Sequence, residues 1–187
     1  MKTPPEALDD ALGLASKEGE LLSTLAEALP ARAPGHALRA RLLASAASPR
    51  LRWAPFFDKL GALFDLDEAA LMQMAERAAL EDQWQPGPLP SVSLFHLSGG
   101  PAIASADAGL VRVAAGFEFP THRHLGEERT LILEGEVRES SGLLRRPGDA
   151  LSMPADSSHS FEVVSSKPLL YALVLFGGVE IGGIKFP

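Results

Sequence analysis

Four side chains in the second half of the chain have the types and spacing that bind a divalent metal ion. His122 and His124 lie two residues apart, and Glu128 follows four residues after the second histidine. Alternate residues of a β-strand lie on one face of a sheet, so these three side chains share one parity and can converge. Imidazoles and a carboxylate suit borderline divalent ions. His159, further along the chain, is the fourth candidate ligand.

Each candidate also has a purely structural interpretation. The four could be ordinary polar residues of a sheet, but an unpaired carboxylate inside a barrel is costly, and a metal ion removes that cost. Glu127 has the opposite parity and is expected to face solvent or a partner, although a bulge at Gly126 would exchange it with Glu128. His96 lies in an alternating strand pattern and is expected to be packed or hydrogen-bonded rather than a ligand.

The composition excludes several classes of protein. The chain has 187 residues, 46% of them hydrophobic, which suits one domain or one and a half. It has no cysteine, so disulfides and thiolate metal sites are excluded. The formal net charge is −7, and without a basic cluster we expect no direct contact with nucleic acid. No apolar run reaches the about 18 residues needed to span a bilayer, and the N-terminus lacks a signal-peptide core. The sequence therefore predicts a soluble, cytoplasmic protein.

The spacing of hydrophobic residues changes from a helical to a strand period near residues 85–90, and the four candidates lie beyond this change. Residues 1–85 have helical periodicity, weakened by Gly13 and Gly19. The last helix should end before Trp84. Expected helix starts are, in chain order, Thr3, Pro34, Pro55 and either Asp65 or Asp67. The block from Gln85 to Pro90 holds three prolines and a glycine, which predicts a boundary between a helical domain, 1–85, and a second domain, 90–187.

Beyond the boundary, short segments alternate with period two and are separated by turn residues. Many short strands at this spacing predict an antiparallel sandwich or barrel of the jelly-roll type. The chain is therefore expected to be α+β, with an N-terminal helical segment followed by a C-terminal antiparallel β-barrel. Tyr171 and Met153 fall on strands near the candidate site and are candidates for its lining.

The first histidine pair lies in a stretch that resembles the first motif of the cupin superfamily. Gly116 is followed by five residues and then by His122 and His124. Three further residues lead to Glu128, and six more lead to Gly135. The full spacing, with both glycines, is far more specific than a lone pair of histidines.

A later stretch resembles the second cupin motif, with Pro147-Gly148-Asp149, then Pro154, then His159. It departs from that motif after the histidine, where Ser160 and Phe161 stand in place of a nearby asparagine. The resemblance covers residues 90–187. It implies a metal-binding cupin barrel whose ligands are the four candidates.

A longer likeness, over residues 50–187, is to the ChrR-type proteins, which join a helical anti-sigma domain to a C-terminal cupin. Their helical domain holds a sigma factor off RNA polymerase, and their cupin part answers a stress such as reactive oxygen. The matching pieces are Trp53, Phe56, Leu60, Leu63-Phe64-Asp65, Trp84, Pro86-Gly87, Phe95-His96-Leu97, Gly100-Pro101, Gly109-Leu110-Val111-Arg112, Phe119-Pro120, His124-Leu125-Gly126-Glu127-Glu128 and Gly177-Gly178-Val179-Glu180.

One feature of that family is missing. Its anti-sigma domain binds zinc through a cluster of histidine and cysteine, whereas this chain has no cysteine and His36 is the only histidine before the barrel. One histidine cannot make a four-coordinate structural site. The helical segment is then either a zinc-less anti-sigma domain held by apolar packing, or a segment that only supports the barrel or a dimer.

Three functions fit these residues. The first is a regulator or sensor in which an oxidant or small ligand in the barrel changes the metal site, with a sigma factor as the partner of the N-terminal helices. The second is a metal-dependent, dioxygenase-type enzyme acting on a small organic substrate, and the third is a purely structural metal site. Few acid–base groups are expected to point inward, which favours sensing over catalysis. Zinc, nickel, manganese, iron and copper all accept such ligands. A homodimer is expected, because two-fold dimers are the commonest oligomers.

Overall fold

The computed structural model describes residues 24, 28, 30, 35–48 and 51–186. The helical stretch predicted from Thr3 to Pro30 therefore lies almost wholly outside the described residues. The chain forms two compact units, residues 1–43 and 44–187. Of the helices that the structure describes, none has the length and apolar character required to cross a membrane.

Helices precede strands along the chain, which confirms the predicted α+β class. The helical elements are α2 (His36–Ala47), the 3₁₀ turns η2 (Ala54–Phe56), η3 (Glu81–Gln83) and η4 (Pro101–Ile103), and the helices α3 (Phe57–Phe64) and α4 (Glu68–Ala78). The strands are β1 (Gln85–Pro86), β2 (Val92–Leu97), β3 (Asp107–Val113), β4 (Glu118–His124), β5 (Glu128–Glu134), β6 (Val137–Glu139), β7 (Leu144–Arg145), β8 (Ala150–Met153), β9 (Ser158–Val163), β10 (Leu169–Leu175), β11 (Val179–Ile181) and β12 (Ile184–Phe186).

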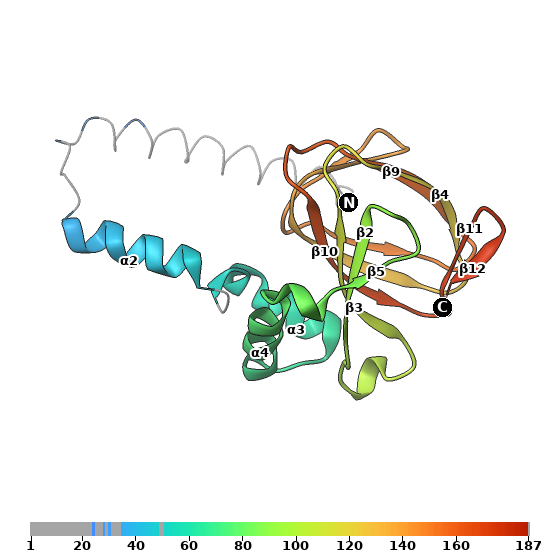
Figure 1. Cartoon of the computed structure of the whole chain (residues 1–187), viewed down its shortest axis with the longest axis horizontal. Helices are drawn as coiled ribbons and strands as arrows, with labels where there is room; N and C mark the ends of the chain where they lie inside the picture. The colour runs from blue at the N-terminus through green and yellow to red at the C-terminus, as the bar shows by residue number, and fades with distance from the viewer. Residues whose placement is uncertain (1–23, 25–27, 29, 31–34, 49–50, 187) are drawn as a thin grey trace, which may run out of the picture. The chain divides into compact units, whose positions relative to one another are not determined.

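The strands form two antiparallel sheets that face each other as a jelly roll (Figure 1). The first sheet has the order β1-β2-β3-β10-β5-β8, and the second has the order β12-β11-β4-β9-β6-β7. Side chains from both sheets meet between them in one apolar core, which includes Val113 and Leu169 from the first sheet and Val163 from the second. The predicted cupin barrel is thus confirmed as a barrel-like sandwich.

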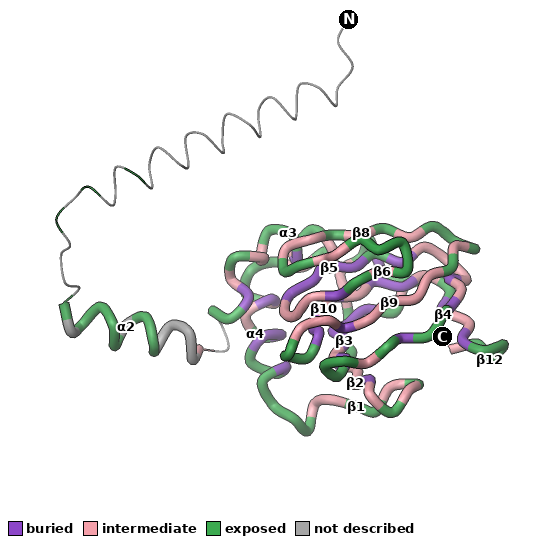
Figure 2. Tube along the Cα trace, turned by 90° about the horizontal axis from the view of Figure 1, so that it is seen from above, coloured by how far each residue is buried: buried purple, intermediate pink, exposed green. Residues whose placement is uncertain are grey.

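The central strands of the first sheet are covered on both faces, whereas its edge strands β1 and β8 are largely exposed. The sequence of the central strand β10 is almost continuously apolar for this reason. Leu169 and Tyr171 face the second sheet, whereas Leu170 and Ala172 face the helices. A strand that is covered on both sides needs apolar residues at every position rather than at alternate ones. Figure 2 colours most residues of β5 and β10 as buried.

The outer face of the first sheet is covered by α3 and α4. Leu60, Phe64 and Leu71 are almost completely buried there, as is Trp53 just before η2. Burying a large apolar side chain stabilises a fold by about 1.5–3 kcal/mol, so these contacts fix the helices on the sheet. The boundary predicted at residues 85–90 stays a prediction, and α3 and α4 belong to the same compact unit as the strands.

Two aspartates define the ends of these helices. The Asp67 carboxylate accepts a 2.8 Å hydrogen bond from the Ala70 amide and caps α4, as one of the two predicted alternatives required. Asp65 instead ends α3 in a left-handed conformation with φ of 55°, and its carboxylate accepts a bond from the Ala102 amide. Helix α4 ends at Ala78, before Trp84 as expected.

Candidate metal centre

Three histidines from two neighbouring strands meet inside the barrel. His122 and His124 occupy alternate positions at the end of β4, and His159 on β9 pairs directly with His122. One nitrogen from each ring lies within 4.8 Å of the corresponding nitrogens of the other two. The β4–β9 pairing shifts register between Phe119 and His122, at Pro120, which has no amide hydrogen to give to the ladder.

Glu128, the first residue of β5, lies beside the histidines. Its Oε2 is 3.6 Å from Nε2 of His124, and only 9% of the residue is exposed. Gly126 allows the tight turn that brings β4 into β5, because a Cβ there would clash with the backbone carbonyl of Phe176. The amide of Phe176 also donates to the Glu127 carbonyl, at 2.9 Å, and so fixes this turn against the end of β10.

Glu127 points away from the histidines, as its parity predicted. Its carboxylate accepts two bonds from Arg129, both 2.8 Å long, and a third from the hydroxyl of Ser152. No exchange with Glu128 through a bulge is present in this part of the described chain. The carboxylate that faces the imidazoles is therefore the one that the cupin spacing indicated.

Burial keeps all three imidazoles neutral at physiological pH. It lowers the pKa of His122, against the hydrogen bond to Pro120, and lowers the pKa of His124 to about 4 with a further contribution from repulsion by His122. Burial, together with repulsion by the other two histidines, lowers the pKa of His159 to about 3. Neutral imidazole is the form that binds a metal ion.

Burial acts in the opposite direction on the carboxyl group and raises the pKa of Glu128 to about 7. The same environment raises the pKa of the Tyr171 hydroxyl, with a further contribution from Glu128. A cation at the site would reverse the effect on Glu128, because it favours the ionised carboxylate.

Unpaired nitrogen atoms provide an independent test of whether a metal ion fits. Nε2 of His124 and Nδ1 of His159 are buried, and neither has a hydrogen-bond partner in the described part of the chain. Nε2 of His122 and Nε2 of His159 are 3.0 Å apart. Buried polar atoms are almost always paired, so an unpaired nitrogen aimed at a carboxylate and two other imidazoles indicates a missing ligand. The donor set of nitrogen and carboxylate oxygen fits a divalent ion.

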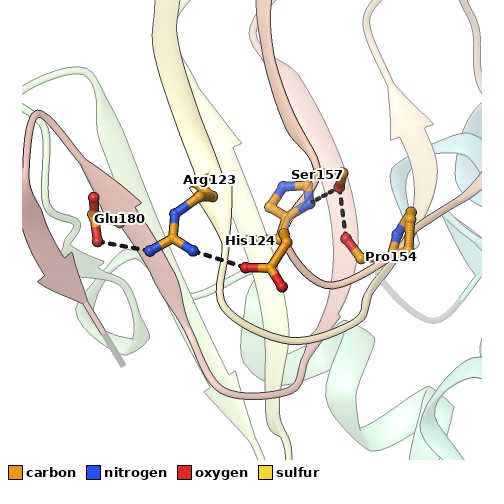
Figure 3. A network of polar contacts seen from close by, with 6 residues as sticks. Arg123, His124, Pro154, Ser157 and Glu180 are labelled. Atoms are coloured by element: carbon orange, nitrogen blue, oxygen red, sulfur yellow. Dashed lines mark hydrogen bonds and ion pairs between the residues drawn. The ribbon is translucent and has the colours of Figure 1, made fainter.

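The backbone next to His124 is held in place by a turn and an arginine. The amide of His124 donates to the Ser157 carbonyl at 2.9 Å, and the His124 carbonyl accepts from the Asp156 amide at 2.8 Å. Arg123 points outward and bonds Asp156 at 2.8 Å and Glu180 at 3.1 Å (Figure 3). These contacts tie β4 to the turn before β9 and to β11.

A cavity of about 40 Å³ lies next to the histidines. Its lining is mostly apolar, with polar groups contributed by the histidines, by Glu128, by Thr130 and Tyr171, and by Glu139. The complete lining is His122, Glu128, Thr130, Ile132, Val137, Glu139, Leu151, His159, Phe161, Leu169 and Tyr171. Tyr171 is thus found where it was expected. Met153 pairs with Glu128 across β8 and β5 but is absent from this lining.

The other sequence candidates lie elsewhere. His96 is not part of the histidine cluster, as expected, but the prediction that it is packed was wrong, because its side chain is exposed on β2. The side chain of His36 is outside the described residues. Sequence reasoning missed Ser157, whose hydroxyl contacts His124, and Glu139, which lines the cavity. No spacing rule in the sequence identifies Ser157 and Glu139, because their positions at the site depend on how strands far apart in the sequence pack together.

Comparisons with known proteins identify the family. A search of curated proteins found no match to this chain. Among solved structures, the chain is similar to an RmlC-like cupin protein from Ralstonia eutropha, with 19% identity over 51% of this chain and 64% of that one, and a TM-score of 0.45. It therefore spans less than two thirds of that protein.

Two further structures show similar likeness. An acetylacetone dioxygenase from Acinetobacter johnsonii shares 13% identity over 58% of this chain and 79% of that one, with a TM-score of 0.46. The complex of Rhodobacter sphaeroides SigE with the anti-sigma ChrR shares 20% identity over 91% of this chain and 82% of that one, with a TM-score of 0.47. The sequence profile described as the ChrR cupin-like domain matches residues 73–177, more than half of the chain. This chain belongs to the ChrR cupin-like domain family.

Proposed function

We propose that this protein is a metal-dependent regulator of the ChrR type, in which a divalent ion held by His122, His124, Glu128 and His159 senses an oxidant or another small ligand. The observation that carries the proposal is the cluster of three neutral imidazoles, two buried and one half-buried, with the buried Glu128 carboxylate 3.6 Å from the unpaired Nε2 of His124. Three nitrogens and one oxygen suit zinc, nickel, manganese or iron, and the site itself does not select among them. Such an ion would supply a Lewis-acidic centre that takes a further ligand.

The size and lining of the cavity favour sensing over turnover of an organic substrate. A site needs about 10–15 Å³ to hold one water molecule, so about 40 Å³ admits only a few non-hydrogen atoms. Tyr171, Thr130 and Glu139 are the polar lining groups that are not proposed ligands. A dioxygenase-type enzyme would need more room and a group placed to move protons. Turnover of a panel of small organic substrates by the iron-loaded protein would instead support the enzyme.

The proposed partner of the helical segment is a sigma factor. Family membership supports it, and so do three leucines of α2, Leu38, Leu42 and Leu43, which are between 45% and 60% exposed. No cysteine is present to rebuild the zinc cluster of related anti-sigma domains, so the helical segment itself would have to be held by apolar packing. The homodimer and the cytoplasmic location remain predictions.

The metal site is tested by elemental analysis of the full-length protein purified without added metal. We expect one ion per chain in the wild type and almost none in His122→Ala, because one of three imidazole donors is lost. Glu127→Ala is the matched control, since it removes a neighbouring carboxylate that points outward, and it should keep the ion. A His122→Ala protein that keeps a stoichiometric ion would refute the site.

The regulatory proposal is tested by co-purification from the native cell extract. The tagged full-length protein should retain a sigma factor, and an oxidant should release it from the metal-loaded protein but not from the metal-free protein. If no sigma factor is retained under either condition, the regulatory proposal fails while the metal site stands on its own measurement.

A further inference from the structure

The three histidines differ in what contacts their second ring nitrogen. Nδ1 of His122 is 3.1 Å from the carbonyl oxygen of Pro120. A carbonyl only accepts hydrogen bonds, so Nδ1 of His122 carries the ring proton and Nε2 is left with a free lone pair. His122 is therefore held in the tautomer that presents Nε2 to an ion.

His124 is held in the same tautomer through a serine. Nδ1 of His124 is 3.1 Å from Oγ of Ser157, and that hydroxyl donates its single proton to the Pro154 carbonyl at 2.6 Å (Figure 3). Ser157 can then only accept from His124, so Nδ1 of His124 donates and Nε2 keeps its lone pair. This Nε2 is the buried atom without a hydrogen-bond partner in the described chain, and it lies 3.6 Å from the Glu128 carboxylate.

His159 has no such contact. Its Nδ1 is buried without a partner in the described chain, and its Nε2 lies 3.0 Å from Nε2 of His122. Since Nε2 of His122 has a lone pair, the proton between the two rings belongs to His159. In the protein without an ion, His159 is therefore the opposite tautomer from the other two. To bind an ion it must move its proton to Nδ1, where no acceptor is available.

We infer that His159 is the weakest of the three histidine ligands and the one that gives way when a small molecule reaches the ion. This inference rests on the proposed metal site and deepens it. The position of His159 agrees with this order, because His159 and His122 line the cavity through which such a molecule would approach, and of these two only His122 has an acceptor for its Nδ1 proton. Ser157 is in turn a positioning residue, which acts on the site through the ring orientation and tautomer of His124.

The tautomers are read from long-range proton–nitrogen NMR spectra of the labelled, full-length protein. Without metal, His122 and His124 should carry their protons on Nδ1, and His159 should carry its proton on Nε2. Addition of zinc should move the His159 proton to Nδ1 and leave the other two rings unchanged. If His159 already carries its proton on Nδ1 without metal, the inference is overturned, and this readout needs no variant that might fail to fold.

Zinc affinity and displacement provide the second measurement. The fold-loss of zinc affinity in His159→Ala should be at least about ten times smaller than the fold-loss in His124→Ala. The reason is that His159 lacks the supporting contact on its second nitrogen, and such a contact is worth about 10–100-fold in metal affinity. Ser157→Ala should lower zinc affinity by about 10–100-fold, and Ser157→Thr, which keeps the hydroxyl, should have nearly the wild-type affinity. Azide, a three-atom probe, should release His159 first from the zinc-loaded protein.

The outcomes separate this inference from the proposed function. Equal losses for His159→Ala and His124→Ala, or release of His122 or His124 before His159, overturn the inference and leave the metal site intact. If the wild-type protein binds no stoichiometric zinc, the proposed function fails, and the inference fails with it.

Discussion

Replacing Glu128 with glutamine should make the metal-free protein more stable at alkaline pH. Burial raises the pKa of Glu128 from its ordinary value of 4.5 to about 7, whereas the unfolded chain ionises near the ordinary value. Between these two values the folded state holds a proton that the unfolded state has released. Stability therefore falls as pH rises from about 4.5 to about 7, and the full loss is present above pH 7.

The size of the effect follows from the shift. One pKa unit corresponds to about 1.36 kcal/mol, so the buried carboxylate costs the metal-free fold up to about 3 kcal/mol above pH 7. The groups that face it are Nε2 of His124, at 3.6 Å, and Tyr171, and neither supplies a positive charge at pH 8. Glu128→Gln removes the charge and should recover much of this loss at pH 8 and almost none near pH 4.

Urea unfolding of chelator-treated protein at pH 4, 6 and 8 measures this difference. The fluorescence of the buried Trp53 reports the transition. Glu127→Gln is the matched control, and it should not gain stability at pH 8, because Arg129 holds the pKa of Glu127 below its usual range. With zinc bound, the order should reverse, since Glu128→Gln removes a ligand. A metal-free Glu128→Gln protein that is less stable than the wild type at pH 8 would refute the reasoning.

Other substitutions test the parts of the fold that support the site. Leu60→Ala, in the fully buried layer between α3 and the first sheet, should lose about 2–5 kcal/mol in urea unfolding, and a loss below 1 kcal/mol would contradict that packing. Glu134→Ala leaves Nε1 of Trp53, now 2.9 Å from its carboxylate, without an acceptor and should cost about 1–3 kcal/mol, whereas Glu134→Gln keeps an acceptor and should recover most of it. Gly126→Ala forces the turn before Glu128 to move and should lower zinc affinity, measured by competition with a chelator; unchanged affinity would show that the turn tolerates a side chain.

The alternating pattern of short strands predicted the antiparallel barrel, and strand parity placed His122 and His124 on one face, whereas the convergence of His159 with them was implied by the resemblance to the cupin motifs. Glu128 rather than Glu127 lies inward, as expected, but parity does not explain it, because residues 125–127 form a turn between β4 and β5. The role of Ser157 could not be predicted, because it depends on how the turn before β9 lies against β4. The packing of α3 and α4 on the sheet was also beyond prediction, since an amphipathic helix does not specify which apolar surface it covers.

The opposite pKa shifts at the site explain why these four groups belong together around a cation. Burial favours neutral imidazoles, which is the state that binds metal, but it also favours a protonated carboxyl group, which is not. Without an ion, the buried histidines lower the stability of the fold below about pH 6.5, and the buried Glu128 lowers it above about pH 4.5. At every pH, at least one of the four groups therefore destabilises the metal-free protein. A divalent cation removes the conflict, because it binds the deprotonated form of every one of them. Of the residues that the structure describes at this site, none carries a positive charge that could do the same.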